Sequence, residues 1–141
     1  MKELIHKIAA CDDSNVVLRQ MAGYFEEFQN DTGIELAPAY FSSGEELLKH
    51  MSDDTELIFL DISMGEMNGI ECARQLRAQG RDLPIVFITS MTEYALDGYA
   101  VHAFGFLPKP VTYGTFADIT REALSKAAPA MTPRTWYISS S

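Results

Sequence analysis

Short apolar runs alternate with amphipathic stretches along most of this chain. Five runs rich in apolar residues are separated by segments with helical spacing, and several of the runs contain almost no polar side chain. Strands that are buried on both faces of a parallel sheet have continuous apolar runs of this kind. We therefore predict five strands, at residues 8–11, 34–41, 57–60, 84–89 and 103–107.

The stretches between these runs carry apolar residues at spacings of three and four, which is typical of helices with one buried face. The apolar face of the first stretch comprises Leu18, Met21, Ala22, Phe25 and Phe28. Gly33 then acts as a stop signal. Ser43 and Glu46 match a capping box, and Asn68 is a candidate helix cap. Helices are predicted after these caps and also at about 93–99 and 113–127.

Alternating strands and helices predict βαβ units with a parallel sheet and right-handed crossovers. The expected fold is an α/β flavodoxin-like (βα)5 three-layer sandwich with a five-stranded parallel sheet in the order 2-1-3-4-5. Pro38 favours an edge position for the second strand, because proline cannot donate to a neighbouring strand. We assign residues 1–127 to this domain. We expect residues 128–141 to be a linker and the start of a further C-terminal output domain, because Arg134–Ile138 has strand-like composition.

Composition and charge narrow the classes of function. The 141 residues are 47% hydrophobic and 22% charged, as in an ordinary globular domain. There are 20 acidic residues against 11 basic ones, which gives a net charge of −9. Nucleic acids and anionic lipid surfaces attract basic proteins. We therefore expect this domain not to bind nucleic acid or a membrane directly.

Cysteine usage and hydropathy predict a cytoplasmic protein. Cys11 and Cys72 form no Cys-x-x-Cys pair and have the character of reduced core residues. The first residues show no signal-peptide pattern, and no apolar run approaches the roughly 18 residues of a membrane helix. The histidines, His6, His50 and His102, do not share a strand end, so we predict structural or solvated roles for them.

Polar side chains that can bind metal or phosphate follow the predicted strands. Because parallel strands present their carboxyl ends at one edge of the sheet, residues at these ends come together even when they are far apart in sequence. The residues at this edge are Asp12, Asp13, Asp61, Thr89, Ser90 and Lys109. Taken alone, Asp12-Asp13 before Ser14 could be a turn and a helix cap. Convergence from four segments indicates a site instead.

Three neighbouring carboxylates repel one another unless a cation lies between them. Mg²⁺ prefers oxygen ligands and is held by one or two carboxylates, with its remaining positions open to water and phosphate oxygens. A lysine and a hydroxyl beside such an ion suit phosphoryl transfer. A carboxylate can itself be the nucleophile and form an aspartyl phosphate. These residues therefore predict a Mg²⁺-dependent phosphoryl-transfer site.

Five separated motifs carry a family resemblance. They are Asp12-Asp13, Asp61-x-x-Met64, Met67-Asn-Gly69, Thr89 and Lys109-Pro110. Together, and in this order, they resemble the receiver domain of two-component response regulators over residues 6 to about 127. Residues 87–99, with Thr89 twenty residues before Lys109, are similar to receivers attached to LytTR-type DNA-binding domains.

The resemblance implies a set of metal ligands. Asp13 and Asp61 would bind Mg²⁺ directly, together with the backbone carbonyl of Ser63. Asp12 would act mainly through a metal-bound water. Gly65 departs from the family, in which proline is common at this position, and we expect a looser loop there.

The resemblance also implies roles in phosphorylation. Asp61 would accept a phosphoryl group from a sensor histidine kinase, and Lys109 would pair with a phosphoryl oxygen. Thr89 would hydrogen-bond another oxygen, while Phe106 repacks as the aromatic partner in the switch. Tyrosine is frequent where this chain has Phe106, which keeps the ring and lacks the hydroxyl.

We therefore expect a phosphorylation switch that catalyses only its own phosphorylation and dephosphorylation. Its output would be transcription through a LytTR-type domain, and its partners a histidine kinase and a second copy bound through the fourth helix, fifth strand and fifth helix. One alternative is a stand-alone receiver that acts by protein contact or phosphorelay. Another is a Mg²⁺-dependent phosphohydrolase of the haloacid dehalogenase type, but such enzymes place a second acid where this chain has Ser63. A degenerate receiver that is never phosphorylated fits poorly with the complete acidic set.

Overall fold

The protein folds around one five-stranded parallel sheet. The computed structural model describes residues 5–90 and 100–125. The sheet has the order β2-β1-β3-β4-β5, which confirms the predicted topology. Its strands are β1 (Ile5–Cys11), β2 (Glu35–Phe41), β3 (Leu57–Asp61), β4 (Ile85–Thr89) and β5 (Gly105–Pro108).

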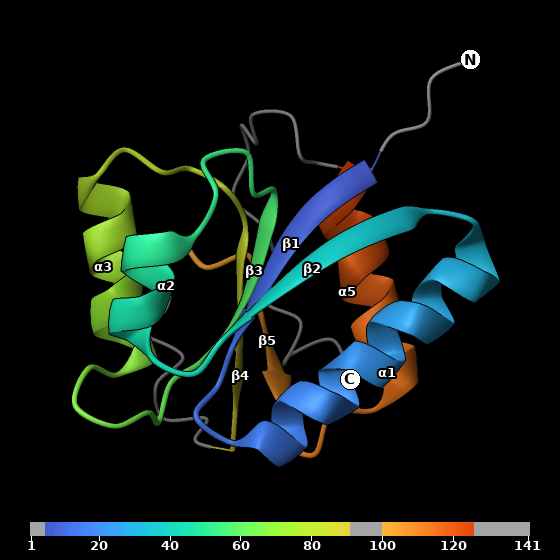
Figure 1. Ribbon diagram of the computed structural model, residues 1–141, viewed down its shortest axis with the longest axis horizontal. Coiled ribbons are helices and arrows are strands. Elements are labelled where there is room, and N and C mark those ends of the chain that lie inside the picture. The colour runs from blue at the N-terminus through green and yellow to red at the C-terminus, as the bar shows by residue number, and fades with distance from the viewer. Residues whose placement is uncertain (1–4, 91–99, 126–141) are drawn as a thin grey trace.

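Helices cover both faces of the sheet and complete the three predicted layers (Figure 1). The described part of the chain contains α1 (Asn15–Thr32), α2 (Gly44–His50), α3 (Gly69–Ala78) and α5 (Tyr113–Ser125). Helices α1 and α5 lie on one face, and α2 and α3 on the other. The helix predicted at 93–99, the end of the one predicted at 113–127, and the segment 128–141 lie outside the described residues. None of the helices within 5–90 and 100–125 has both the length and the apolar character needed to cross a bilayer.

The core consists of two clusters, one on each face of the sheet. Every residue of β3 and β4 is buried, so the continuous apolar runs mark the central strands. On the α1 and α5 side, Phe116 is fully buried and its ring contacts those of Phe25 and Phe59, with centroids 5.5 and 5.4 Å away. On the α2 and α3 side, Phe87 and Phe106 pack with centroids 5.4 Å apart. Each cluster packs one face of the sheet against its pair of helices.

Helix starts follow the predicted caps, with one difference. The Asn68 side chain accepts from the Glu71 amide at 2.9 Å, and Ser43 Oγ accepts from the Glu46 amide at 3.0 Å. The predicted capping box also requires Glu46 to accept from the Ser43 amide. Instead, the Glu46 carboxylate accepts from the amide of Ser42 at 2.8 Å and from its hydroxyl at 3.1 Å. The Glu46 carboxylate thus accepts two hydrogen bonds from Ser42, whereas in a capping box it would accept one from the Ser43 amide.

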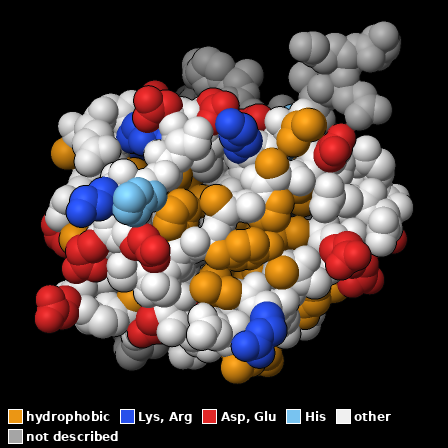
Figure 2. All heavy atoms as spheres, in the orientation of Figure 1, with side chains coloured by type: hydrophobic (Ala, Val, Ile, Leu, Met, Phe, Trp, Pro, Cys, Tyr) orange, Lys and Arg blue, Asp and Glu red, His pale blue; other side chains and the backbone are white. Residues whose placement is uncertain are grey.

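The predicted edge strand is protected against pairing with another strand. Pro38 offers no N–H, and the Leu36 amide donates to Gln29 Oε1 of α1 at 2.9 Å. The Tyr40 side chain is 40% exposed on this strand. Figure 2, which has the orientation of Figure 1, shows hydrophobic side chains at the centre of the face that is turned to the viewer.

Candidate functional site

The predicted acidic residues meet at the carboxyl edge of the sheet. Asp61 is the last residue of β3, while Asp12 and Asp13 follow the end of β1. One carboxylate oxygen from each residue lies within 4.8 Å of the others. Asp12 and Asp61 are buried, whereas Asp13 is exposed. The structure therefore brings together the three carboxylates that the strand ends predicted.

Lys109 places an ammonium group between two of these carboxylates. Its Nζ lies 3.2 Å from Asp12 Oδ2 and 3.3 Å from Asp61 Oδ1. The Lys109 amide donates to the Thr89 carbonyl at 3.1 Å. This bond lies at the end of the β4–β5 pairing and fixes the backbone from which the Lys109 side chain extends. The peptide bond from Lys109 to Pro110 is cis.

The two carboxylate oxygens of Asp12 have different surroundings. Oδ1 accepts from the Ser14 amide at 2.9 Å, and the Asp12 amide donates to the Phe41 carbonyl at 3.1 Å. Oδ2 is buried and pairs with Lys109, but makes no hydrogen bond of good geometry. Buried polar atoms are normally hydrogen-bonded. The ordinary interpretation of Asp12 as a turn residue thus accounts for Oδ1, whereas Oδ2 faces the ammonium group of Lys109.

Burial and like charge act on the ionisation of Asp61. Burial, followed by the charge of Asp12, raises the pKa of Asp61 to about 6, although Lys109 acts in the opposite direction. For Lys109, burial lowers the pKa, but Asp61 and Asp12 outweigh this effect and raise the pKa above its ordinary value. The site thus holds more negative charge than one lysine neutralises.

This raised pKa predicts how stability depends on pH. A carboxyl group with a higher pKa in the folded than in the unfolded state binds more protons when folded, so its contribution to stability falls as pH rises. For Asp61 the loss should begin near pH 4 and be complete above about pH 6 to 7. It should amount to roughly 2 to 3 kcal/mol.

Urea unfolding without divalent cations, at pH 4.5 and 7.5, measures this effect. Asp61→Asn should be more stable than the wild type by a margin that grows with pH, because asparagine does not titrate. A margin that stays constant, or shrinks, between these two values of pH would contradict the prediction.

A glycine supports the backbone of Asp61 from the following loop. The Gly69 amide donates to the Ile62 carbonyl at 2.8 Å. A Cβ added at Gly69 would lie 2.2 Å from the carbonyl oxygen of Asp61. The motif that contains Gly69 can be recognised in the sequence. The structure shows why a glycine is needed there: two backbone segments approach each other closely at this position.

The loop between Asp61 and Gly69 follows a path that the family's usual proline would not adopt. Gly65 has φ +32°, whereas a proline ring holds φ near −65°. A proline could therefore not adopt the backbone conformation of Gly65. Ser63 is exposed in this loop.

The two residues expected to act as the switch lie on neighbouring strands. Thr89 ends β4 and is 2% exposed, and it is paired in register with Pro108. Phe106 is 1% exposed and is paired in register with Phe87. Thr89 therefore lies at the carboxyl edge, while the Phe106 ring is packed within the core.

Other residues singled out in the sequence have structural surroundings. His6 Nδ1 lies 2.8 Å from Glu56 Oε1. Cys11 and Cys72 are both free and buried, and burial raises the pKa of each thiol, to about 12 for Cys72.

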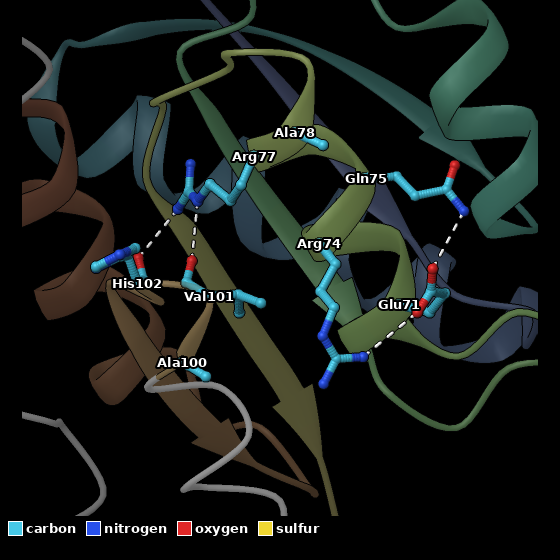
Figure 3. Close-up of a pocket in the computed structure, with 8 residues that line it drawn as sticks. All are labelled: Glu71, Arg74, Gln75, Arg77, Ala78, Ala100, Val101 and His102. Carbon is cyan, nitrogen blue, oxygen red and sulfur yellow. Dashed lines mark hydrogen bonds and ion pairs between the residues drawn. The ribbon is translucent and has the colours of Figure 1, made fainter.

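A surface hollow of about 630 Å³ lies along α3 and contains none of the predicted site residues (Figure 3). Arg77 extends from α3 toward Val101 and His102 in this region, and donates to their carbonyls at 2.8 and 3.0 Å. It also donates to the carbonyls of Arg81 and Leu83, each at 2.8 Å. The Arg77 guanidinium thus holds these backbone segments together, which is a structural role.

Solved structures define the class to which this fold belongs. A CheY-like receiver domain protein from Methanospirillum hungatei superposes with a TM-score of 0.75 at 18% identity, over 88% of this chain and 97% of that chain. The chemotaxis protein CheY4 of Vibrio cholerae is 30% identical, with a TM-score of 0.68, over 85% of this chain and 99% of that chain. The fold is that of CheY-like signalling domains.

A family model described as the response regulator receiver domain matches residues 8–121, and the chain belongs to this family. Curated relatives include sensory transduction protein LytT of Oceanobacillus iheyensis, 31% identical over 79% of this chain and 45% of that protein. Response regulator MprA of Mycobacterium leprae is 30% identical over 87% of this chain and 53% of that protein. A protein-glutamate methylesterase/protein-glutamine glutaminase of a Nocardioides species is 30% identical over 91% of this chain and 36% of that protein. The chain thus spans about a third to a half of the length of these relatives. LytT proteins are among its curated relatives, in agreement with the narrower resemblance.

Proposed function

We propose that this receiver accepts a phosphoryl group from a sensor histidine kinase on Asp61, in a Mg²⁺-dependent reaction, and that this changes its conformation. The observation that carries the proposal is the Asp61 carboxylate at the end of β3, which is buried beside an ammonium group and two further carboxylates. These groups come from the ends of three strands: Asp12 and Asp13 follow β1, Asp61 ends β3 and Lys109 follows β5. Their convergence fits phosphoryl transfer, in which the protein mainly positions groups and balances charge.

The donor set fits a magnesium ion. Three carboxylates can each offer an oxygen within 4.8 Å of the others, and Asp12 Oδ2 lacks a well-aligned hydrogen bond. Oxygen donors are the ligands that Mg²⁺ prefers. Asp13 and Asp61 would hold the ion with the Ser63 carbonyl, and Asp12 would act through water. When bound, Mg²⁺ neutralises charge on the oxygens of the group being transferred.

The protein's own groups divide the remaining work. An Asp61 carboxylate oxygen attacks phosphorus, so that an O–P bond forms as the N–P bond to the kinase histidine breaks, and the imidazole leaves with that electron pair. The Lys109 ammonium, 3.3 Å from Asp61 Oδ1, can turn to a phosphoryl oxygen. The Thr89 hydroxyl would donate to another oxygen.

A small preference for one conformation suffices for a switch. A tenfold change in population requires about 1.4 kcal/mol, and a charge-assisted hydrogen bond supplies about that much. Movement of Thr89 toward the phosphoryl group, with repacking of Phe106, would carry the change along β4 and β5. The face formed by the fourth helix, β5 and α5 would then pair with a second copy.

The regulated output would be transcription through a LytTR-type domain that follows the receiver. The LytT relatives are longer than this chain, which supports a second domain. The stand-alone alternative is favoured by a different observation, since the chain covers 99% of CheY4. The full reading frame distinguishes the two outputs without affecting the site.

Incubation with acetyl phosphate and Mg²⁺, followed by intact-mass measurement, tests the proposed function. We expect the addition of one phosphoryl group, which disappears when EDTA replaces Mg²⁺. Hydroxylamine should release the group, because an acyl phosphate is attacked at its carbonyl carbon. Borohydride reduction followed by peptide mapping should locate it at Asp61. No adduct under these conditions, or an adduct on another residue, would refute the proposal.

A further inference from the structure

The loop that follows Lys109 is held by a tyrosine from α1. The β4–β5 ladder ends with the Lys109 amide bonded to Thr89, and Pro110 has no N–H to continue it. Immediately beyond, the Tyr24 hydroxyl donates to the Val111 carbonyl at 2.7 Å. This bond joins residues 87 positions apart in sequence and connects the loop after Lys109 to α1.

The surroundings of Tyr24 fix the direction of its hydroxyl. Its ring packs against the rings of Tyr113 and Phe116 of α5, with centroids 5.7 and 5.4 Å away. Gln20 Nε2 donates to the same hydroxyl at 3.4 Å. The Val111 side chain is 4% exposed and belongs to the same core cluster as Phe116. Both ends of the bond are therefore held by packing.

The position of the Lys109 ammonium group depends on the backbone from which its side chain extends. A lysine side chain is long and flexible, so it reaches both carboxylates only from a backbone at a suitable distance. The Lys109 side chain is 26% exposed, yet its Nζ is 3.2 and 3.3 Å from two carboxylates. Its backbone must therefore lie at the right distance from Asp61.

We propose that Tyr24 is a positioning residue for Lys109: its hydroxyl, bonded to the Val111 carbonyl, fixes the backbone that presents the ammonium group to Asp61. Tyr24 lies on α1 and acts through the loop that follows Lys109. The proposal rests on the function proposed above, because it concerns the part that Lys109 takes in phosphoryl transfer.

Tyr24→Phe tests this role, since it removes one oxygen and keeps the ring contacts. Tyr113→Phe is the matched control, because its hydroxyl donates to Asp31 Oδ2 at 2.8 Å and not to the loop. With acetyl phosphate and Mg²⁺, we expect Tyr24→Phe to be phosphorylated about three- to tenfold more slowly than the wild type, as the loss of one hydrogen bond allows. Tyr113→Phe should react at the wild-type rate.

Two further measurements distinguish a role in positioning Lys109 from a general loss of stability. The Mg²⁺ dissociation constant, from an NMR titration, should be unchanged in Tyr24→Phe, because β1 and β3 position the carboxylates. Hydrogen exchange should show a local effect, with the Lys109 amide losing protection while the Ile58 amide, bonded to the Pro84 carbonyl at 3.1 Å, retains it.

The outcomes are distinct. Wild-type rates in Tyr24→Phe, or an equal loss of protection at Lys109 and Ile58 with weaker Mg²⁺ binding, would overturn the role of Tyr24 and leave the proposed function intact. A wild-type protein that takes no phosphoryl group would instead refute the proposed function.

Discussion

Asp61→Asn is expected to abolish phosphorylation and, at the same time, to stabilise the metal-free fold. Asparagine offers no carboxylate nucleophile, so the adduct should fall below detection. It also resembles the protonated form of Asp61, which the site favours because burial and Asp12 raise the pKa of this carboxyl to about 6. The free energy of unfolding at pH 7.5 should therefore rise, by about 1 to 3 kcal/mol.

The measurements are intact mass after incubation with acetyl phosphate and Mg²⁺, and urea unfolding without divalent cations. Asp54→Asn is the matched control, since Asp54 is an exposed acid whose carboxylate lies 3.0 Å from Lys7 Nζ. It should be fully phosphorylated, with a stability within about 0.5 kcal/mol of the wild type. An Asp61→Asn protein that still forms the adduct, or that is less stable than the wild type at pH 7.5, would contradict the prediction.

Gly69→Ala is expected to damage both the fold and the site. The added Cβ would lie 2.2 Å from the Asp61 carbonyl oxygen and 3.0 Å from both the Asp61 carbonyl carbon and Ile62 Cα. These are all backbone atoms of the segment that carries Asp61, so neither side can give way by changing a rotamer. We expect a loss of about 2 to 4 kcal/mol in the free energy of unfolding. Phosphorylation should slow by more than about tenfold, because small displacements of reacting groups are costly.

Gly23→Ala is the matched control for this substitution. Gly23 lies within α1, and a Cβ added there would have no neighbour within 4 Å. Alanine is the better helix former, so this variant should gain about 0.5 to 1 kcal/mol and be phosphorylated normally. Urea unfolding and the acetyl phosphate assay measure both variants. If Gly69→Ala matched the wild type in both assays, the close approach of the two backbone segments would not constrain the site.

The strands and the acidic edge could be predicted because their signals are local. Fully buried strands require continuous apolar runs, and the ends of such runs at Asp12, Asp61 and Thr89 can be read directly. Once the strands are parallel, these ends must share one edge of the sheet. The edge position of β2 likewise follows from one residue, Pro38.

Contacts between distant segments could not be predicted in this way. The need for glycine at position 69 arises from the backbone of Asp61, and the Tyr24 hydroxyl meets a carbonyl 87 residues away. Neither contact leaves a periodic pattern in the chain. The Glu46 carboxylate similarly bonds to Ser42, because local geometry selects among neighbouring donors that the sequence alone presents as equivalent.

The sequence by itself determined the order of the elements, the parallel sheet and which acidic residues stand at its carboxyl edge, because burial and strand direction impose these features on consecutive residues. The tertiary structure decided the arrangement of charge within the site. It placed Lys109 Nζ near Asp12 and Asp61, left Asp12 Oδ2 without a well-aligned hydrogen bond, and brought Tyr24 to the loop after Lys109. Such distances depend on how helices pack across the sheet, and packing involves side chains from all parts of the chain at once.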